Sequence, residues 1–357
     1  MFDDYNTLQE LPKCLPLFQG LQSQFATRLD QVMLHYQGSI ILSIRLNFLL
    51  GHEHSDVIDR MISKGIAKGV KRIELLFSYQ TTNDPPSPYY LDQIEPYTFP
   101  FAFFSETDSL LYLHLEKCHL VAPTTDFSDF TLDTCKFKSD LKIISPTLFH
   151  FNILNCGVKL LERRNIDIIA SNLSSLEYFC NGRVVHKINI KEAHMLSKFS
   201  FRGSIISKRV GLSGLKHLTT IVLDGLSECL RLTVLPLLFS EYLQLEDVTF
   251  KNCSITWELE IISPKLRHLN IIDCAFEGKR TPDIIIDALN LSSFEYSGHT
   301  KAFYVKAPKL LNVFWSAAKR DKNPYLFGPI ATLNQIENLA LILNHSQVNQ
   351  SKPVFVI

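Results

Sequence analysis

Apolar residues recur at fixed intervals between residues 245 and 276, and the same interval pattern occurs twice. The first copy is Leu245, Val248, Phe250, Cys253 and Ile255, and the second, 21 residues later, is Leu266, Leu269, Ile271, Cys274 and Phe276. Within each copy, two apolar residues separated by a single residue point to the same face of a short strand. One such coil cannot bury its own apolar side, so the pattern predicts neighbouring coils that stack on it.

The interval pattern LxxLxLxxCxL is typical of a leucine-rich repeat and recurs along most of the chain. Its frames start at Leu110, Leu148, Leu173, Leu196, Leu218, Leu245, Leu266, Leu291, Leu310 and Ile336. The eight steps from Leu148 to Ile336 average 23.5 residues, which lies within the range of this repeat class. The sequence therefore predicts an α/β repeat solenoid, a curved leucine-rich-repeat array of about ten to twelve coils. Between Leu110 and Leu148 we expect an irregular coil at residues 121–140.

The first hundred residues predict a short helix-strand lead-in to this array. Helical periodicity appears at residues 24–36 and again at 55–68, where Ser55 is a suitable N-cap and Gly69 a suitable stop. Strand patterns follow each helix, at 41–48 and 70–77, and a proline-rich loop follows at 78–96. We expect a short lead segment at 1–24, the lead-in at 25–100, the repeat array at 101–345 and a tail at 346–357.

Composition and charge narrow the range of functions. Hydrophobic residues make up 46% of the 357 residues, charged residues make up 20%, and the formal net charge is zero. This balance argues against general binding to nucleic acid or to anionic membranes. The sequence contains no apolar run of membrane-spanning length, and its polar, acidic start is unlike a signal peptide. We therefore expect a cytoplasmic or nuclear protein, in which the repeat cysteines Cys118, Cys156, Cys253 and Cys274 are buried free thiols.

Residue patterns that would carry chemistry are missing. The sequence contains no phosphate-binding glycine loop, no HExxH, no GxSxG and no CxxC. His52 with His54, and His114 with His119, are close in sequence, but a zinc site needs more ligands at metal spacing. Asp126 and Asp129 fit a polar loop between repeats better than a metal site. We expect no enzymatic activity, no cofactor and no bound metal.

The outward positions of the strands form the surface that is available for recognition, because they alternate with the buried positions. In solenoids this strand face is the usual site for a partner. Its mixture of both charges, imidazoles and aromatic anchors suits a polar peptide or protein. The predicted partner-binding face contains Tyr112, His114, Glu116, His150, Asn152, Glu177, Lys198, Arg202, Asp224, Asp247, Lys251, His268, Asn270, Glu295 and Phe314.

Several stretches resemble the leucine-rich-repeat part of the plant F-box/LRR proteins, which often also carry an FBD segment. They are FATRLDQVMLHYQGSIILSIRLNF (25–48), VIDRMISKGIAKGVKRIELLFS (57–78), YTFP (97–100) with SLLYLHLEKCHL, ALNLSSFEYSG (288–298) and APKLLNVFWSAAK (307–319). The resemblance covers about residues 25–345. It implies a protein-protein interaction module, the substrate-recognition domain of an SCF-type ubiquitin-ligase adaptor. It also implies a protein substrate on the strand face.

The F-box itself is not recognisable in this sequence, because only Leu11-Pro12 and Leu15-Pro16 resemble its opening. Residues 1–24 predict at most one short helix, which Pro12 and Pro16 interrupt. The resemblance implies a Skp-type adaptor and a cullin as partners only where an F-box is present, so we expect no tight adaptor binding. The alternative is a truncated relative that acts as a free binding module or has no activity. An enzyme on a repeat scaffold is the hypothesis from another class, and no catalytic motif favours it.

Overall fold

The computed structural model describes residues 2–3, 15–77, 94–104, 110–121, 127–156, 164–180, 187–203, 210–211, 215–226, 239, 242–255, 259–276, 283–298, 302–317 and 334–342. The chain divides into two compact units. Unit 1 consists of Met1–Leu173 and His186–Ala193, and unit 2 consists of Ser174–Val185 and His194–Ile357. Each unit is described here by itself.

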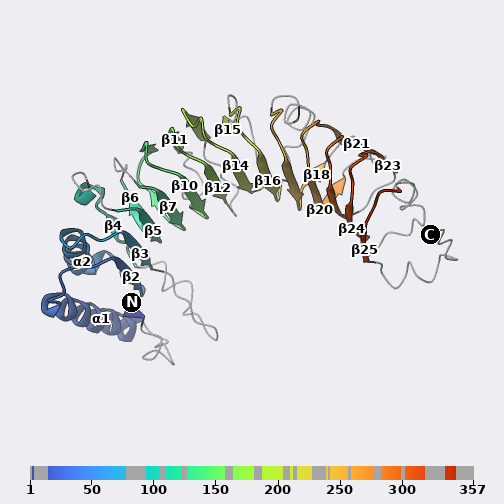
Figure 1. Cartoon of the computed structure of the whole chain (residues 1–357). Helices are drawn as coiled ribbons and strands as arrows, with labels where there is room; N and C mark the ends of the chain where they lie inside the picture. Colours follow the sequence, from blue (N-terminus) through green and yellow to red (C-terminus); the bar gives the residue numbers. More distant parts are fainter. Residues whose placement is uncertain are drawn as a thin grey trace. The chain divides into compact units, whose positions relative to one another are not determined.

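Unit 1 contains a parallel sheet in which each strand pairs with a strand from the next coil (Figure 1). Its strands, in hydrogen-bonded order, are β1 (Phe2–Asp3), β2 (Ser43–Asn47), β3 (Arg72–Leu76), β5 (Tyr112–Glu116), β7 (Asp129–Asp133) and β10 (His150–Leu154). A second parallel sheet runs β13 (Lys187–Lys191), β11 (Asn165–Ile169) and β9 (Leu141–Ile144). A third consists of β4 (Thr98–Phe99), β6 (His119–Leu120) and β8 (Lys136–Phe137).

Unit 2 repeats this arrangement. Its main sheet runs β12 (Ser175–Phe179), β14 (Lys198–Arg202), β16 (Thr220–Asp224), β17 (Asp247–Lys251), β20 (His268–Phe276), β22 (Ser293–Gly298), β24 (Asn312–Ala317) and β25 (Asn338–Ile342). A second sheet runs β19 (Leu259–Ile262), β21 (Asp283–Asp287) and β23 (Ala302–Lys306), and β18 (Ser254–Ile255) pairs with β20. The short strand β15 spans Val210–Gly211. Each unit is therefore a parallel β-solenoid with few helices.

Two α-helices of unit 1, α1 (Leu15–His35) and α2 (Ser55–Ala67), lie beside β2 and β3 (Figure 1). Two 3-10 turns accompany them, His52–His54 and Phe101–Phe104. Arg60 of α2 joins the helices through Asp30, with 3.0 Å between Nε and Oδ1. Gly65 lets α2 approach β2, because a Cβ atom at this position would lie 2.3 Å from Cδ1 of Ile44. None of the described helices is both long and apolar enough to cross a membrane.

The core follows directly from the alternation of the strands. In β10 the inward residues Phe151 and Ile153 are fully buried, whereas His150 is exposed. Parallel register stacks equivalent side chains, so the ring of Phe130 lies on that of Phe151 with 5.3 Å between centroids. Burying a side chain of this size stabilises the fold by about 1.5–3 kcal/mol. Each of the ten frames predicted from the leucine spacing contains a strand.

The corner after the main strands has a recurring backbone conformation that the sequence pattern alone did not reveal. In six coils, the residue at the end of the regular strand pairing has a positive φ. The values are 53° at Lys117, 52° at Thr134, 50° at Asn155, 50° at Asn252, 51° at Asp273 and 78° at Gly225. The next residue is a buried cysteine in five of these six coils and Leu226 in the sixth. A residue in the left-handed conformation thus turns the chain and directs the following apolar side chain inward.

Two sequence-based predictions need correction. Helix α1 begins at Leu15 rather than Gln24, because a proline is tolerated in the first helical turn, where its missing N–H has no partner to lose. Residues 127–137 form a regular coil with strand β7 rather than an irregular one. The frame was present as FxxFxLxxCxF (Phe127, Phe130, Leu132, Cys135, Phe137), with phenylalanine in place of leucine.

Parts of the predicted organisation lie outside the described residues. They include residues 4–14 of the lead segment, 78–93 of the proline-rich loop, Asp126 and the tail at 346–357. At the other end of unit 2, β25 departs from its frame, because Leu339 and Leu341 are 54% and 37% exposed although the pattern places them inward. Among the described strands, β25 is the last of its sheet and pairs with β24 alone.

Candidate functional site

The outward face of the main sheet forms straight rows of side chains, because the parallel strands pair without a shift in unit 1. One row runs Ser43, Arg72, Tyr112, Asp129 and His150. The next row, two residues further along each strand, runs Arg45, Glu74, His114, Thr131 and Asn152. Four predicted face residues, Tyr112, His114, His150 and Asn152, therefore lie in two adjacent rows of one sheet.

Charged and aromatic side chains interact closely at the β3–β5 end of these rows. The guanidinium of Arg72 lies over the ring of Tyr112, 3.8 Å from its centroid, and also pairs with Glu74. Arg45 approaches the other oxygen of Glu74 at 3.4 Å between Nε and Oε2. The carboxylate of Glu74 is mostly buried and held between two cations. This end of the face is therefore a preformed ion-pair network rather than a set of free side chains.

His114 lies in the middle of the second row and is the most enclosed imidazole of the face. Burial lowers its pKa, and the carboxylate of Glu74 opposes that effect only in part. Its Nε2 atom is buried and has no hydrogen-bond partner among the residues that the structure describes. A neutral ring at neutral pH follows from this environment. The pKa of Tyr112 is raised, mainly by burial.

The other end of unit 1's face carries two polar pairs between β7 and β10. The Nδ1 atom of His150 lies 2.6 Å from Oδ1 of Asp129, and both side chains are substantially exposed. Beside this pair, Nδ2 of Asn152 donates to Oγ1 of Thr131 at 3.2 Å. Strands β7 and β10 thus each contribute two outward residues to a group of four. We call this group quartet 1: Asp129, Thr131, His150 and Asn152.

Unit 2 presents the same kind of rows. The first runs Ser175, Lys198, Thr220, Asp247, His268, Ser293, Asn312 and Asn338, and the second runs Glu177, Ser200, Val222, Thr249, Asn270, Glu295, Phe314 and Ala340. Seven predicted face residues lie in these rows: Glu177, Lys198, Asp247, His268, Asn270, Glu295 and Phe314. Glu177, Lys198 and His268 are exposed, and the others are half-buried.

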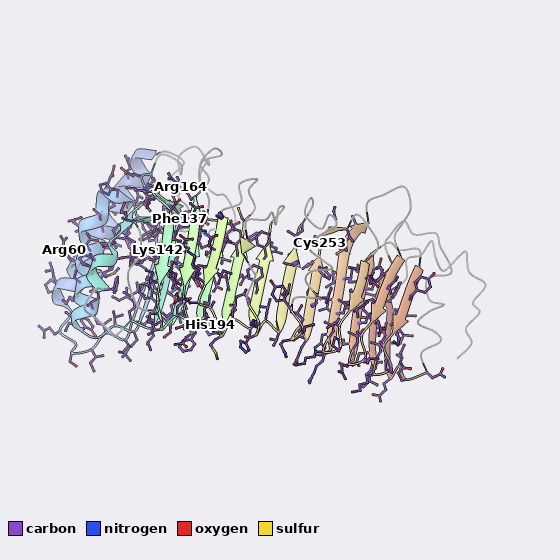
Figure 2. The ribbon with its side chains drawn as sticks, turned by 90° about the horizontal axis from the view of Figure 1, so that it is seen from above. Arg60, Phe137, Lys142, Arg164, His194 and Cys253 are labelled. Carbon is purple, nitrogen blue, oxygen red and sulfur yellow. The ribbon has the colours of Figure 1, made fainter. Side chains whose placement is uncertain are left out.

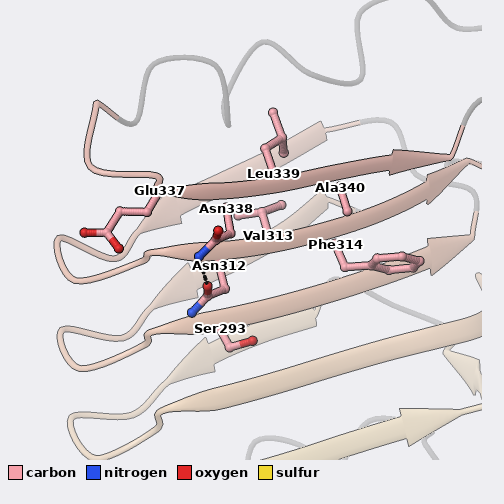
Figure 3. Close-up of a pocket in the computed structure, with 8 residues that line it drawn as sticks. All are labelled: Ser293, Asn312, Val313, Phe314, Glu337, Asn338, Leu339 and Ala340. Carbon is pink, nitrogen blue, oxygen red and sulfur yellow. Dashed lines mark hydrogen bonds between the residues drawn. The ribbon is translucent and has the colours of Figure 1, made fainter.

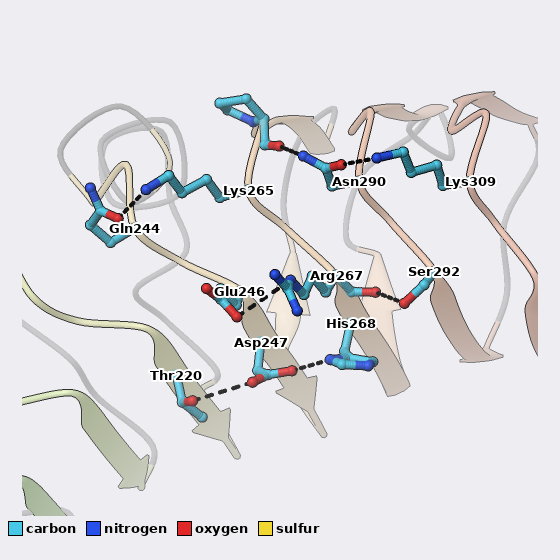
Figure 4. A network of polar contacts seen from close by, with 11 residues as sticks. Thr220, Gln244, Glu246, Asp247, Lys265, Arg267, His268, Asn290, Ser292 and Lys309 are labelled. Atoms are coloured by element: carbon cyan, nitrogen blue, oxygen red, sulfur yellow. Dashed lines mark hydrogen bonds and ion pairs between the residues drawn. The ribbon is translucent and has the colours of Figure 1, made fainter.

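A polar network joins β17 to β20 at the middle of unit 2 (Figure 4). Nδ1 of His268 is hydrogen-bonded to Oδ1 of Asp247, and Thr220 approaches the other carboxylate oxygen at 3.5 Å. Nδ2 of Asn270 donates to Oγ1 of Thr249 at 3.1 Å. Asp247, Thr249, His268 and Asn270 form quartet 2. Next to it, outside the strands, Arg267 pairs with Glu246 at 3.5 Å.

Three predicted face residues lie in the third row of unit 2, which runs Arg202, Asp224 and Lys251. Asp224 is only 7% exposed and accepts from Nε of Arg202 at 2.6 Å and from Nδ2 of Asn252 at 2.9 Å. Glu116 in unit 1 is similarly buried, at 9% exposure. Asp224 and Glu116 are therefore better described as buried polar groups than as freely exposed recognition residues.

A shallow hollow marks the β22–β25 end of unit 2 (Figure 3). Its lining residues are Ser293, Asn312, Val313, Phe314, Glu337, Asn338, Leu339 and Ala340. Asn338 donates through Nδ2 to Oδ1 of Asn312 at 2.7 Å, which fixes both amides at the rim. Phe314 lies on the outward side of β24, whereas its neighbour Trp315 is fully buried, as the strand alternation predicted. Aromatic residues are enriched at protein interfaces, so Phe314 is a candidate anchor for a partner.

Sequence reasoning missed face residues on β2, β3 and β7. Arg45, Arg72 and Glu74 were missed because the face was traced only from Tyr112 onward. Asp129 and Thr131 were missed because their coil has phenylalanine where the leucine frame was sought. The apolar pattern of these strands could have identified these residues, since any strand in register with β5 extends the same rows of outward side chains.

Other chemistry finds little support among the described residues. None of their His, Cys, Asp and Glu side chains gather in a group of three or more that could hold a metal ion. His114 lies on strand β5 and His119 on strand β6, and these two strands belong to different sheets. Comparison of the chain with protein families, with curated proteins and with solved structures finds no match. The fold and the outward face together define a parallel β-solenoid with a polar, aromatic-containing strand face.

Proposed function

We propose that this protein is a protein-binding module that holds its partner on the outward face of the main sheets. The observation that carries this is the composition of the face, where charged, imidazole, amide and aromatic side chains stand in aligned rows over a rigid parallel sheet. Side chains ordered by cross-strand contacts lose little freedom when a partner binds, which favours recognition. We further propose that the coils are leucine-rich repeats with a helix-strand lead-in, and that the array is curved.

The family resemblance in the sequence suggests which kind of partner-binding protein this is. By that resemblance the face would be the substrate-recognition surface of an F-box/LRR adaptor in an SCF-type ubiquitin ligase of plants, acting in the cytoplasm or nucleus. The second candidate is a free binding module without ligase docking. The observation that favours it is helix α1, which buries Ala26, Leu29 and Met33 within unit 1 and so does not offer them to a docking partner.

Site-specific photocrosslinking tests the proposed face. A photoreactive amino acid would replace Ser43 or Lys198, which are exposed on the face and lie outside both quartets. In matched controls it would replace Lys142 or Glu260, which are exposed on the second sheets of the two units. Figure 2 labels Lys142 on its strand. We expect a discrete crosslinked protein from the face positions alone. The same product from all four positions, or from the second sheets only, would contradict the proposal.

A further inference from the structure

Quartet 1 and quartet 2 contain the same four residues in the same positions. Residues 129–156 align without a gap with 247–274, and thirteen of the 28 aligned residues are identical. The alignment places Asp129 on Asp247, Thr131 on Thr249, His150 on His268 and Asn152 on Asn270. The structure repeats the contacts as well, since both quartets contain an Asp–His hydrogen bond and an Asn-to-Thr hydrogen bond. The chain thus carries one polar arrangement twice, once in each unit.

The quartets are more alike than the strands that carry them. Inward positions of the same strands have diverged more, because Phe130, Leu132 and Phe151 correspond to Val248, Phe250 and Leu269. The remaining outward positions have diverged too, since Asp133 corresponds to Lys251 and Leu154 to Ile272.

Cross-strand polar pairs of many kinds satisfy a sheet surface, as the ion pair of Arg202 with Asp224 shows on neighbouring strands. Packing therefore explains why polar residues occur at the quartet positions. It does not explain why the same four polar residues occur there twice. A shared ligand does.

The hydrogen bonds within a quartet leave mainly acceptors for a ligand. A carboxylate only accepts, so Nδ1 of the histidine donates to the aspartate, and Nε2, on the far side of the ring, accepts when it carries no proton. The asparagine donates its amide N–H to the threonine, which leaves its Oδ1 directed away from that bond. The second carboxylate oxygen is a third acceptor, which Thr220 also approaches in quartet 2 at 3.5 Å, and the aspartate supplies a negative charge. Threonine and aspartate thus fix the asparagine and histidine in place.

We propose that each quartet binds the guanidinium group of an arginine side chain of the partner. A guanidinium is planar, always charged and has five N–H donors in a fixed fork, so it can satisfy several fixed acceptors at once. A lysine ammonium has fewer donors and no planar fork. This inference rests on the proposed function, because it names the chemistry of the partner that the face would hold.

Histidine ring resonances in the intact protein report on the two quartets separately. Spectra of His150→Gln and His268→Gln assign the two rings. The probe is N-acetyl-arginine amide, with N-acetyl-lysine amide as the matched cation without a guanidinium. We expect saturable shifts of both ring signals with the arginine probe, and weaker, unsaturated shifts with the lysine probe.

Substitutions then assign the binding to the quartets. Asp129→Asn should weaken the arginine effect at His150 roughly tenfold and leave His268 unchanged, since a charge-assisted bond is lost. Asp247→Asn should do the reverse. Asp133→Asn removes the same charge from an outward position of β7 outside the quartet and should change neither response. Thermal melting of each variant checks that the fold is intact.

The proposal is overturned if the arginine probe gives no saturable shift, if both probes act equally, or if Asp133→Asn acts like Asp129→Asn. None of these outcomes affects the crosslinking test, which does not depend on arginine. A crosslinked partner without arginine binding would therefore remove the ligand chemistry alone. Loss of the face-specific crosslink would remove the proposed function itself.

Discussion

Buried thiols at the corners illustrate how one side chain connects the sequence pattern with stability. Cys253 and Cys274 follow the left-handed residues of adjacent coils and are 1% and 3% exposed (Figure 2 labels Cys253). Cys253 directs its Sγ at the carbonyl oxygens of Leu223 and Lys251, at 3.4 and 3.2 Å. The pKa of the Cys274 thiol is raised, mainly by its hydrogen bond with Cys253 and secondly by burial. These cysteines are small core residues whose position the repeat frame predicted.

Replacing a corner cysteine by aspartate should be strongly destabilising. We expect Cys274→Asp to lower the free energy of unfolding by about 3 kcal/mol or more, because it buries a carboxylate or forces its protonation. Cys274→Ala, the matched control, should cost about 1 kcal/mol. Urea denaturation measures both. In the native protein, Cys253 and Cys274 should react slowly with thiol reagents, and rapid labelling of both would contradict their assignment.

His114 should make stability depend on pH. Its folded-state pKa is lowered by burial, so below the unfolded value of about 6.5 the unfolded chain binds more protons than the folded one. Stability should therefore fall as the pH falls through about 6.5 toward the lowered folded pKa. Denaturation at about pH 7 and about pH 5.5 should show a smaller difference in His114→Gln than in the parent chain. Some dependence should remain, because burial also lowers the pKa of His119.

At the scale of the element, periodicity predicted the strands of the ten frames, placed the start of α1 too late, and did not predict strand β7. A strand needs only alternating apolar residues, and these are readable in each frame from Leu110 to Leu310. The start of α1 depends on the role of Pro16, which interrupts a helix in its interior but is accepted in its first turn. The corner conformation was not predictable, because Lys117, Thr134 and Asn155 do not share a side-chain chemistry that demands a positive φ.

The corner conformation predicts substitutions of opposite sign. Thr134 is β-branched and has a φ of 52°, so Thr134→Gly should relieve backbone strain and raise the free energy of unfolding by about 1 kcal/mol. Loss of the hydrogen bond from Oγ1 of Thr134 to Asp133 offsets part of this gain. Gly225→Ala, at a φ of 78° in the equivalent corner, should lower it by about 1 kcal/mol. Thermal and urea unfolding of both variants measure the effect. If Thr134→Gly were clearly destabilising, relief of backbone strain would not govern this corner.

The candidate site shows the same division between what strand alternation determines and what only the folded structure reveals. Alternation predicted that His150, Asn152, His268 and Asn270 face outward, and they do. It did not distinguish exposed from covered residues, so Asp224 was predicted as a recognition residue although Arg202 and Asn252 enclose it. The register between coils decides such contacts, and a single strand pattern does not contain it.

For the whole molecule, adaptor docking separates the two forms of the proposed function. Helix α1 buries Ala26, Leu29 and Met33 within unit 1, and a specific interface needs about 800 Å² from each partner. We expect the purified chain to bind a Skp-type adaptor far more weakly than a full-length F-box relative does. A pull-down with that relative as positive control measures the difference. Comparable binding would favour the ligase-adaptor form over the free binding module.

The affinity of the crosslinked partner for two charge-reversal variants tests the central claim most directly. Lys198→Glu changes an exposed residue of the strand face, and Lys142→Glu makes the same change on a second sheet. We expect Lys198→Glu to weaken partner binding at least tenfold, or roughly 1.4 kcal/mol, and Lys142→Glu to leave it unchanged. Equal affinity of the two variants, or a loss confined to Lys142→Glu, would contradict recognition through the strand face.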